Sequence, residues 1–223
     1  MTVHLAGTVP TEIGQLTQLK WLALTENNFI GVLPTELGQL TKLTLLSAFG
    51  NAFESSVPTE IGLLTALVIS SLRDNKFQGP IPSELGLLSN LTVTLNLRNN
   101  LFSSNIPTEL GLLTDLDEIE LSGNQLTGNI PSELGQVTRI VKLTFANNRL
   151  TGTIPDELSS LWDVLNTLSF EGNKLSGTIP QALCDVNGTC VPTTNIDWCE
   201  GNYGLSYDCT NLLCGCDCSC NGV

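Results

Sequence analysis

Apolar residues recur along this chain in a short repeating pattern rather than in long runs. In the clearest unit, LDEIELSGNQLTGNIPSEL, the apolar positions are Leu116, Ile119, Leu121, Leu126, Ile130 and Leu134. The alternation at Ile119 and Leu121 predicts a short strand that turns both side chains into a core, while the residues between and beside them face outward. The P-S-E-L segment that ends the unit is too short for a long helix and predicts a single 3₁₀ or α turn.

Prolines mark the period of this pattern. They stand 24 or 25 residues apart, at Pro10, Pro34, Pro58, Pro82, Pro107, Pro131, Pro155 and Pro180. An asparagine precedes each of the last seven by seven residues, at Asn27, Asn51, Asn75, Asn100, Asn124, Asn148 and Asn173. Repeats of this length indicate a solenoid, in which each unit buries its apolar face against its neighbours. Because an amide is both donor and acceptor, the asparagines are predicted to form a structural ladder that pairs backbone groups between successive turns.

The unit resembles the plant-type leucine-rich repeat, LxxLxLxxNxLxGxIPxxLGxLxxL, from residue 5 to about residue 183. The resemblance implies an α/β fold, namely a right-handed, horseshoe-shaped solenoid with a parallel sheet on its concave side and short 3₁₀ or α segments on its outer side. The departures from the consensus are Ala48, Ser55, Ser70 and Ser104, and one extra residue near Leu91 and another near Trp162. These departures affect local geometry and leave the fold prediction unchanged.

The repeat divides the chain into two expected parts. Residues 1–183 should form the solenoid, as one partial and seven further repeats, and residues 184–223 should form a cysteine-rich C-terminal cap. The repeat starts inside a unit, since Val3 stands where the first asparagine would be. We therefore expect an N-terminally truncated fragment whose missing part held the first cap and any signal or anchor.

All the cysteines lie in the second part, at Cys184, Cys190, Cys199, Cys209, Cys214, Cys216, Cys218 and Cys220. An even number in a short tail predicts disulfides made in an oxidising compartment. The alternative is a thiolate metal cluster, but the C-x-C-x-C-x-C spacing is not that of structural zinc and no metal site is expected. Cys184 and Cys190 are the expected local pair, and the other pairings stay open. Such a tail is similar to those of secreted repeat proteins from algae of the diatom lineage.

Charge and hydropathy exclude several classes of function. The chain carries 9 basic and 22 acidic residues, a net charge of −13, so it should repel phosphate and not bind nucleic acid. No apolar stretch is long enough to cross a bilayer, so direct membrane insertion by this segment is not expected. A single histidine, His4, leaves little room for triad catalysis. We expect an extracellular or cell-surface location, with any membrane anchor in a missing segment.

The outward strand positions should form the binding face. Its N-terminal third presents Trp21, Leu45, Phe49 and Ile69, its middle Arg73 and Arg98, and its next turn Glu118 and Glu120. Exposed aromatic side chains beside arginines are typical of a binding hot spot. The alternative is that the apolar group packs against missing N-terminal repeats or under a flanking segment.

Two carboxylates on one strand also raise the question of catalysis. Glu118 and Glu120 lie about 7 Å apart on one face, a separation that glycosidases can use. A cross-strand charge network with Arg98 and Lys142 explains them more simply. We therefore expect neither an enzyme nor a cofactor.

Three functions follow from the resemblance and the face. The first is an extracellular recognition module, similar to the ectodomains of receptor-like kinases and receptor-like proteins, that binds a peptide, glycan or partner protein on its concave side. The second is a soluble inhibitor of a cell-wall-degrading enzyme, similar to polygalacturonase-inhibiting proteins. The third, ice or surface binding, is suggested by a hydroxyl ladder formed by Thr17, Thr41, Thr65, Ser89, Thr114 and Thr138. Asn90 and Asn187 each begin an N-x-[ST] glycosylation sequon.

Overall fold

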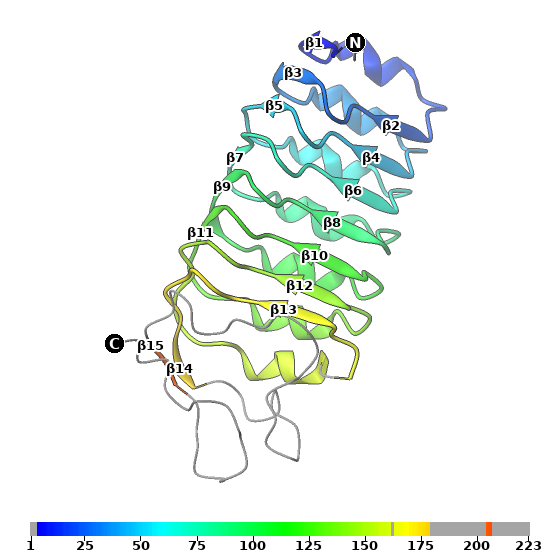
Figure 1. The fold of residues 1–223 in the computed structure, drawn as a ribbon. Helices are drawn as coiled ribbons and strands as arrows, with labels where there is room; N and C mark the ends of the chain where they lie inside the picture. The colour runs from blue at the N-terminus through cyan, green and yellow to red at the C-terminus, as the bar shows by residue number, and fades with distance from the viewer. Residues whose placement is uncertain (1–3, 162, 179–203, 207–223) are drawn as a thin grey trace.

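The repeats stack into a right-handed solenoid whose concave side is one parallel sheet. The computed structural model describes residues 4–161, 163–178 and 204–206. The main sheet has seven strands, in the order β13-β12-β10-β8-β6-β4-β2 (Figure 1). These strands are β2 Trp21–Ala23, β4 Leu45–Ser47, β6 Ile69–Ser71, β8 Thr94–Asn96, β10 Glu118–Glu120, β12 Lys142–Thr144 and β13 Thr167–Ser169. The solenoid fold predicted from the repeat is confirmed.

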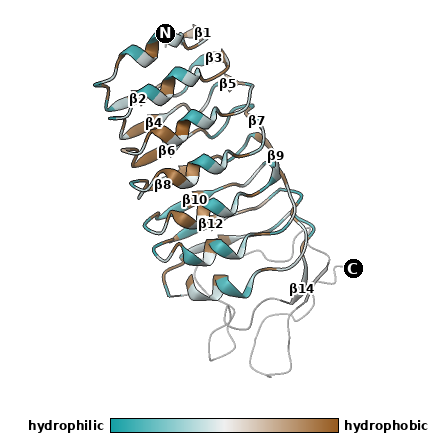
Figure 2. Ribbon diagram, turned by 180° about the vertical axis from the view of Figure 1, so that it is seen from behind, coloured by the Kyte–Doolittle hydropathy of each residue, from teal (hydrophilic) through white to brown (hydrophobic). Residues whose placement is uncertain are grey.

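The outer side of every full repeat is a single helical turn (Figure 2). The turns are η1 Thr11–Gln15, η2 Thr35–Gln39, η3 Thr59–Leu63, η4 Ser83–Leu87, η5 Thr108–Leu112, η6 Ser132–Gln136 and η7 Asp156–Leu161. Within the described ranges all of them are 3₁₀ turns, which resolves the choice between 3₁₀ and α. The repeat proline stands at the start of the turn, as Pro34 does with φ −67° before η2. Proline suits this place because its φ is fixed and the N–H that it lacks would have no helical partner.

Short strands line the edge between the two sides. They are β1 Ala6–Gly7, β3 Asn28–Gly31, β5 Ala52–Phe53, β7 Gln78–Gly79, β9 Leu101–Asn105, β11 Gln125–Thr127, β14 Ser176–Thr178 and β15 Gly204–Ser206. They pair in parallel as β1-β3-β5, β7-β9-β11 and β14-β15. Each repeat therefore has a sheet strand, an edge segment and an outer turn around one core.

Phenylalanine side chains form a continuous stack inside the N-terminal half. The rings of Phe29, Phe53, Phe77 and Phe102 lie nearly parallel, with centroid separations of 6.1, 5.6 and 6.2 Å in that order. Each stands two residues after a ladder asparagine, where the consensus has leucine, and Leu126 and Leu150 occupy the place in later repeats. The sequence analysis did not single out this stack, because the consensus treats the position as simply apolar.

The repeat asparagines connect each turn to the next by hydrogen bonds. Asn100, which is buried, is representative: its Oδ1 accepts from the Phe77 backbone N at 3.0 Å. Its Nδ2 donates to the carbonyl oxygens of Leu72 at 3.0 Å and Leu97 at 3.1 Å. It also donates to the Arg98 carbonyl oxygen at 3.2 Å. One amide thus pairs four backbone groups of two successive repeats, which is why it can close a sharp turn inside the molecule.

Glycine in the outer turn has a packing role that sequence reasoning did not identify. A Cβ added to Gly86 would lie 2.4 Å from the backbone oxygen of Glu109 in the next turn. Only a residue without a side chain permits this approach, so the glycine sets how closely successive outer turns stack.

Ser70 is a polar residue inside the apolar core. It replaces a consensus leucine on β6, is fully buried, and its hydroxyl has no hydrogen-bond partner among the described residues. An unpaired buried hydroxyl costs about 1–3 kcal/mol, so Ser70→Ala should raise the free energy of unfolding by about 1 kcal/mol in urea denaturation. Ser71→Ala, next to it on the half-buried concave side, is the control and should change it little. A loss of stability in Ser70→Ala would show that the hydroxyl is satisfied.

The expected C-terminal cap lies largely outside the described residues. The eight cysteines and Asn187 all fall within 179–203 and 207–223. The cap, its disulfides and that glycosylation site therefore stay predictions.

Candidate functional site

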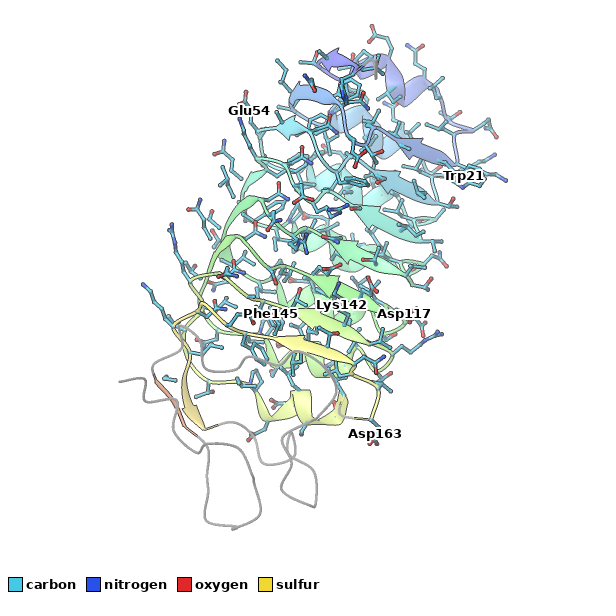
Figure 3. All side chains as sticks on the ribbon, viewed as in Figure 1. Trp21, Glu54, Asp117, Lys142, Phe145 and Asp163 are labelled. Carbon is cyan, nitrogen blue, oxygen red and sulfur yellow. The ribbon has the colours of Figure 1, made fainter. Side chains whose placement is uncertain are left out.

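Strand register aligns the outward side chains into columns across the main sheet. The first column pairs Trp21 with Leu45, Leu45 with Ile69, and so on to Thr167 on β13. Figure 3 shows Trp21 near the N-terminal end of the sheet and Lys142 further toward the C-terminal end. The predicted face is therefore continuous, and its two ends can be compared.

The N-terminal end is apolar and carries one arginine. Trp21 is 73% exposed, whereas Leu45 and Ile69 are half-buried. The guanidinium of Arg73 lies over the Phe49 ring, 4.1 Å from its centroid, and also pairs with Asp74 at 2.5 Å. The Phe49 ring and the Asp74 carboxylate thus fix the Arg73 side chain, so a partner on this face would meet Arg73 and Phe49 together. We call Trp21, Leu45, Phe49 and Ile69 the apolar patch.

Glu120 is the centre of the predicted charge network. The side chain is buried, with Oε2 2.8 Å from Lys142 Nζ and Oε1 2.8 Å from Asn96 Nδ2. Asn96 thus occupies the place that the sequence analysis gave to Arg98, because Asn96 and Glu120 face each other in strand register. Glu118, half-buried on the same strand, has no ion pair among the described residues. Both carboxylate oxygens of Glu120 are occupied, which suits a structural role.

A polar hollow of about 380 Å³ opens beside this network. Its lining includes Arg98, Glu120, Lys142, Thr144 and Glu171, from the repeats that contain β8, β10, β12 and β13. The outward position two residues before each ladder asparagine explains the shape. That position is Arg98, Ser122, Ala146 and Glu171 in four successive repeats. Two small side chains lie between two long charged ones, and the gap above the small ones is the hollow.

Two atoms of the hollow are buried without a partner. They are Nε of Arg98 and Oγ1 of Thr144, and Thr144 is only 7% exposed. Only four buried side-chain polar atoms in the described part of the chain are unpaired, so two in one hollow is a concentration. Buried polar groups are normally satisfied by protein, water or ligand. The hollow is therefore the candidate site.

The structure brings together only some of the predicted site residues. Of these, Arg98 and Glu120 line the hollow, while the apolar patch and Arg73 lie on the same face toward its N-terminal end. The sequence analysis missed Lys142, Thr144 and Glu171 as site residues. The signal available was the change from long to small and back to long side chains at the position two residues before each ladder asparagine.

The other predicted features have simple placements. Asn90 is exposed in a turn before β8, and its Nδ2 donates to the Thr65 carbonyl oxygen at 2.8 Å. The six residues of the hydroxyl ladder are all exposed and follow the outer turns. Within the described ranges no group of three or more His, Cys, Asp or Glu side chains could hold a metal ion. No helix there has the length and hydropathy needed to cross a membrane.

A family model described as Leucine Rich Repeat matches residues 92–113, 115–137, 139–161 and 164–186. Comparison with curated protein sequences gave no significant match. These residue ranges follow the proline and asparagine period of the C-terminal repeats.

Solved structures of plant receptors are similar over most of the chain. The ectodomain of the Arabidopsis thaliana receptor kinase GASSHO1/SCHENGEN3, in complex with CASPARIAN STRIP INTEGRITY FACTOR 2, is 36% identical over 92% of this chain, with a TM-score of 0.84. The Arabidopsis receptor kinase HAESA, in complex with the peptide hormone IDA and the co-receptor SERK1, is 34% identical over 94%, also at 0.84. The chain spans 23% and 33% of these two proteins.

A shorter relative matches over most of its own length. The ectodomain of BIR2 from Arabidopsis thaliana is 36% identical, with 66% of this chain covering 71% of that one at a TM-score of 0.55. The stacked parallel strands, the asparagine hydrogen bonds and these likenesses agree. The chain belongs to the leucine-rich repeat family, in its plant type.

Proposed function

We propose that this chain is an extracellular recognition module, a receptor-like ectodomain or part of one, that binds a peptide or protein partner on its concave face. The polar hollow carries the proposal, because it opens on the concave face and is lined by Arg98 and Glu171, neither of which has an ion-pair partner among the described residues. The solved complexes of the two receptors with a peptide hormone or an integrity factor support it. An enzyme is not proposed, since the carboxylate best placed for chemistry, Glu120, is committed to Lys142 and Asn96.

The apolar patch is proposed as the second part of the same binding face. Trp21 is largely exposed and Phe49 is capped by Arg73, so a partner that covers both gains apolar burial next to a held cation. The hollow and the patch lie on one sheet, which allows one extended ligand to cover them.

A selection of displayed random twelve-residue peptides on the immobilised chain tests this function. For a selected synthetic peptide, Arg98→Ala should raise the Kd about tenfold, because a hydrogen bond to a charged group contributes about 1.5–3 kcal/mol. Arg139→Ala is the control, since Arg139 is an exposed arginine outside the hollow, paired at 3.8 Å with Asp117. It should leave the Kd within about twofold.

Hydrogen exchange locates the bound peptide. Protection should be found on the concave side of the repeats that contain β8, β10, β12 and β13. If the peptide instead protects the outer turns, the concave face is not the binding site. If Arg98→Ala and Arg139→Ala behave alike, the hollow is not part of the binding site.

Ice or surface binding is the second candidate, and one observation favours it. All six hydroxyl residues of the ladder are exposed at equivalent places after the outer turns. Thermal hysteresis in solution that is lost in Thr65→Val with Thr114→Val would support this function, and its absence in the unmodified chain would dismiss it.

A further inference from the structure

Two cations and two anions line the hollow, and only one cation pairs with one anion. Lys142 and Glu120 neutralise each other at 2.8 Å. The ion pairs of the described chain are this one, Arg73 with Asp74, and Arg139 with Asp117. Arg98 and Glu171 therefore line the same hollow as an unpaired cation and an unpaired anion.

The Glu171 carboxylate is oriented by its own repeat, and the stem of Arg98 is buried. Glu171 Oε2 accepts a hydrogen bond from Ser169 Oγ at 2.8 Å. The backbone N of Arg98 donates to Asn96 Oδ1 at 3.1 Å, and the Arg98 Nε is buried and unpaired. A ligand that meets these groups finds them fixed in part, so less conformational entropy is lost on binding.

The two charges are a defined distance apart. Arg98 follows β8 and Glu171 follows β13 by two residues each, and β10 and β12 lie between those strands in the sheet. Three strand spacings of about 4.8 Å separate them by about 14 Å. An extended peptide rises about 3.3 Å per residue, so about four residues cover this distance.

The floor between the charges suits a peptide backbone. Ser122 and Ala146 are the small residues there, and Thr144 contributes its unpaired hydroxyl. Strands β8, β10 and β12 already have a neighbour on each side, so a ligand cannot join the sheet as another strand in this place. A peptide ligand must instead lie across the strands, along the solenoid axis, and be recognised through its side chains.

The described residues that line the hollow include no aromatic side chain. A sugar ring normally stacks its apolar face on an aromatic side chain, and this floor offers none. A uniformly anionic ligand meets Glu171 and a chain of net charge −13. The lining therefore favours a segment with one charge of each sign.

We propose that the hollow selects an extended peptide segment with an acidic and a basic side chain four positions apart, the acidic one at Arg98 and the basic one at Glu171. The inference rests on the proposed function and specifies its ligand. Small or polar residues occupy the positions between the two charges, where the segment passes over Ser122 and Ala146.

A charge exchange tests the inference. Random displayed peptides selected on the unmodified chain should be enriched in an acidic and a basic residue with three residues between them. A synthetic selected peptide should lose at least about tenfold in affinity for Arg98→Glu and for Glu171→Arg, because each substitution sets like charges against each other. The double variant, Arg98→Glu with Glu171→Arg, should bind the peptide whose two charged residues are exchanged and discriminate against the original.

A matched control keeps the composition and moves the exchange elsewhere. Asp117→Arg with Arg139→Glu reverses an ion pair outside the hollow and leaves the net charge unchanged, so it should not alter the peptide preference. Circular dichroism verifies that each variant is folded.

The outcomes separate this inference from the proposed function. Peptides that protect the concave face but show no charge spacing, or that bind the double variant in both charge orders equally, overturn the inference and leave the function standing. Peptides that protect only other surfaces overturn both.

Discussion

Phe77→Ala should lower the free energy of unfolding by about 3–5 kcal/mol, the cost of truncating a fully buried aromatic side chain. Phe77 is fully buried, with Phe53 at 5.6 Å on one side and Phe102 at 6.2 Å on the other. The cavity would be bounded by two further rings that are themselves packed, so collapse can fill little of it. Urea denaturation followed by circular dichroism measures the loss.

The control for this substitution comes from the chain itself. Leu126 and Leu150 occupy the same repeat position as Phe77 and are fully buried. Phe77→Leu should therefore cost less than about 2 kcal/mol, since most of the volume is kept. If Phe77→Ala costs no more than Phe77→Leu, the volume filled by the ring does not stabilise the core and the stated cavity argument is wrong.

Asn100→Ala should have a comparable effect for a different reason, with a loss of about 2–5 kcal/mol. The substitution leaves the Phe77 N–H without its acceptor and removes one of the two amide donors of the Leu72 carbonyl, which still accepts from Asn75 Nδ2 at 3.2 Å. A hydrogen bond lost without leaving an unpaired group costs about 0.5–1.5 kcal/mol. Each buried backbone group left unpaired costs about 1–3 kcal/mol. Denaturation in urea measures the total, and hydrogen exchange should show the weakening mainly in the neighbouring repeats, because repeats contact only their neighbours.

Two further variants test the geometry of the ladder. Asn90→Ala removes an exposed asparagine that makes one hydrogen bond, and it should cost less than about 1 kcal/mol. Asn100→Asp retains an acceptor for Phe77 but places an oxygen against the carbonyls of Leu72 and Leu97, so it should destabilise about as much as alanine. A stable Asn100→Asp variant would show that the donor side of the amide is dispensable.

The two substitutions also bear on the candidate site. Phe77 and Asn100 belong to the repeats that carry Arg73 and Arg98 on the concave face. Loss of the stack or the ladder there should disturb the spacing of the face without touching a ligand group. The free energy of unfolding of such a variant must therefore be measured before a change in its peptide affinity is assigned to the binding face.

The periodic features of the fold were predictable. The apolar alternation at Ile119 and Leu121 predicted a strand there, and the structure has β10 at Glu118–Glu120, one residue earlier. The proline before each unit predicted a short turn, and a 3₁₀ turn follows each one from Pro10 to Pro155. Such features depend on contacts within one repeat and between equivalent positions of neighbouring repeats, so the same positions adopt the same structure along the whole solenoid.

The site was predicted less well. Residues were assigned to the concave face one position at a time, and this assignment cannot tell which long side chain reaches which partner. Glu120 pairs with Asn96, which strand register places opposite it, rather than with Arg98. It also pairs with Lys142, which register places opposite Glu118 and which reaches Glu120 diagonally across the strands. Arg98 lies at a different position of its repeat and is left unpaired beside the hollow.

The amino-acid sequence by itself determined the repeat, the parallel solenoid, the outer turns and which residues face outward. These follow from periodic burial and backbone preferences that hold within a single unit. Only the tertiary structure decided the phenylalanine stack, the partners of Glu120, and the polar hollow between Arg98 and Glu171. Those depend on the lengths of side chains in successive repeats and on where their ends meet, which no single repeat contains.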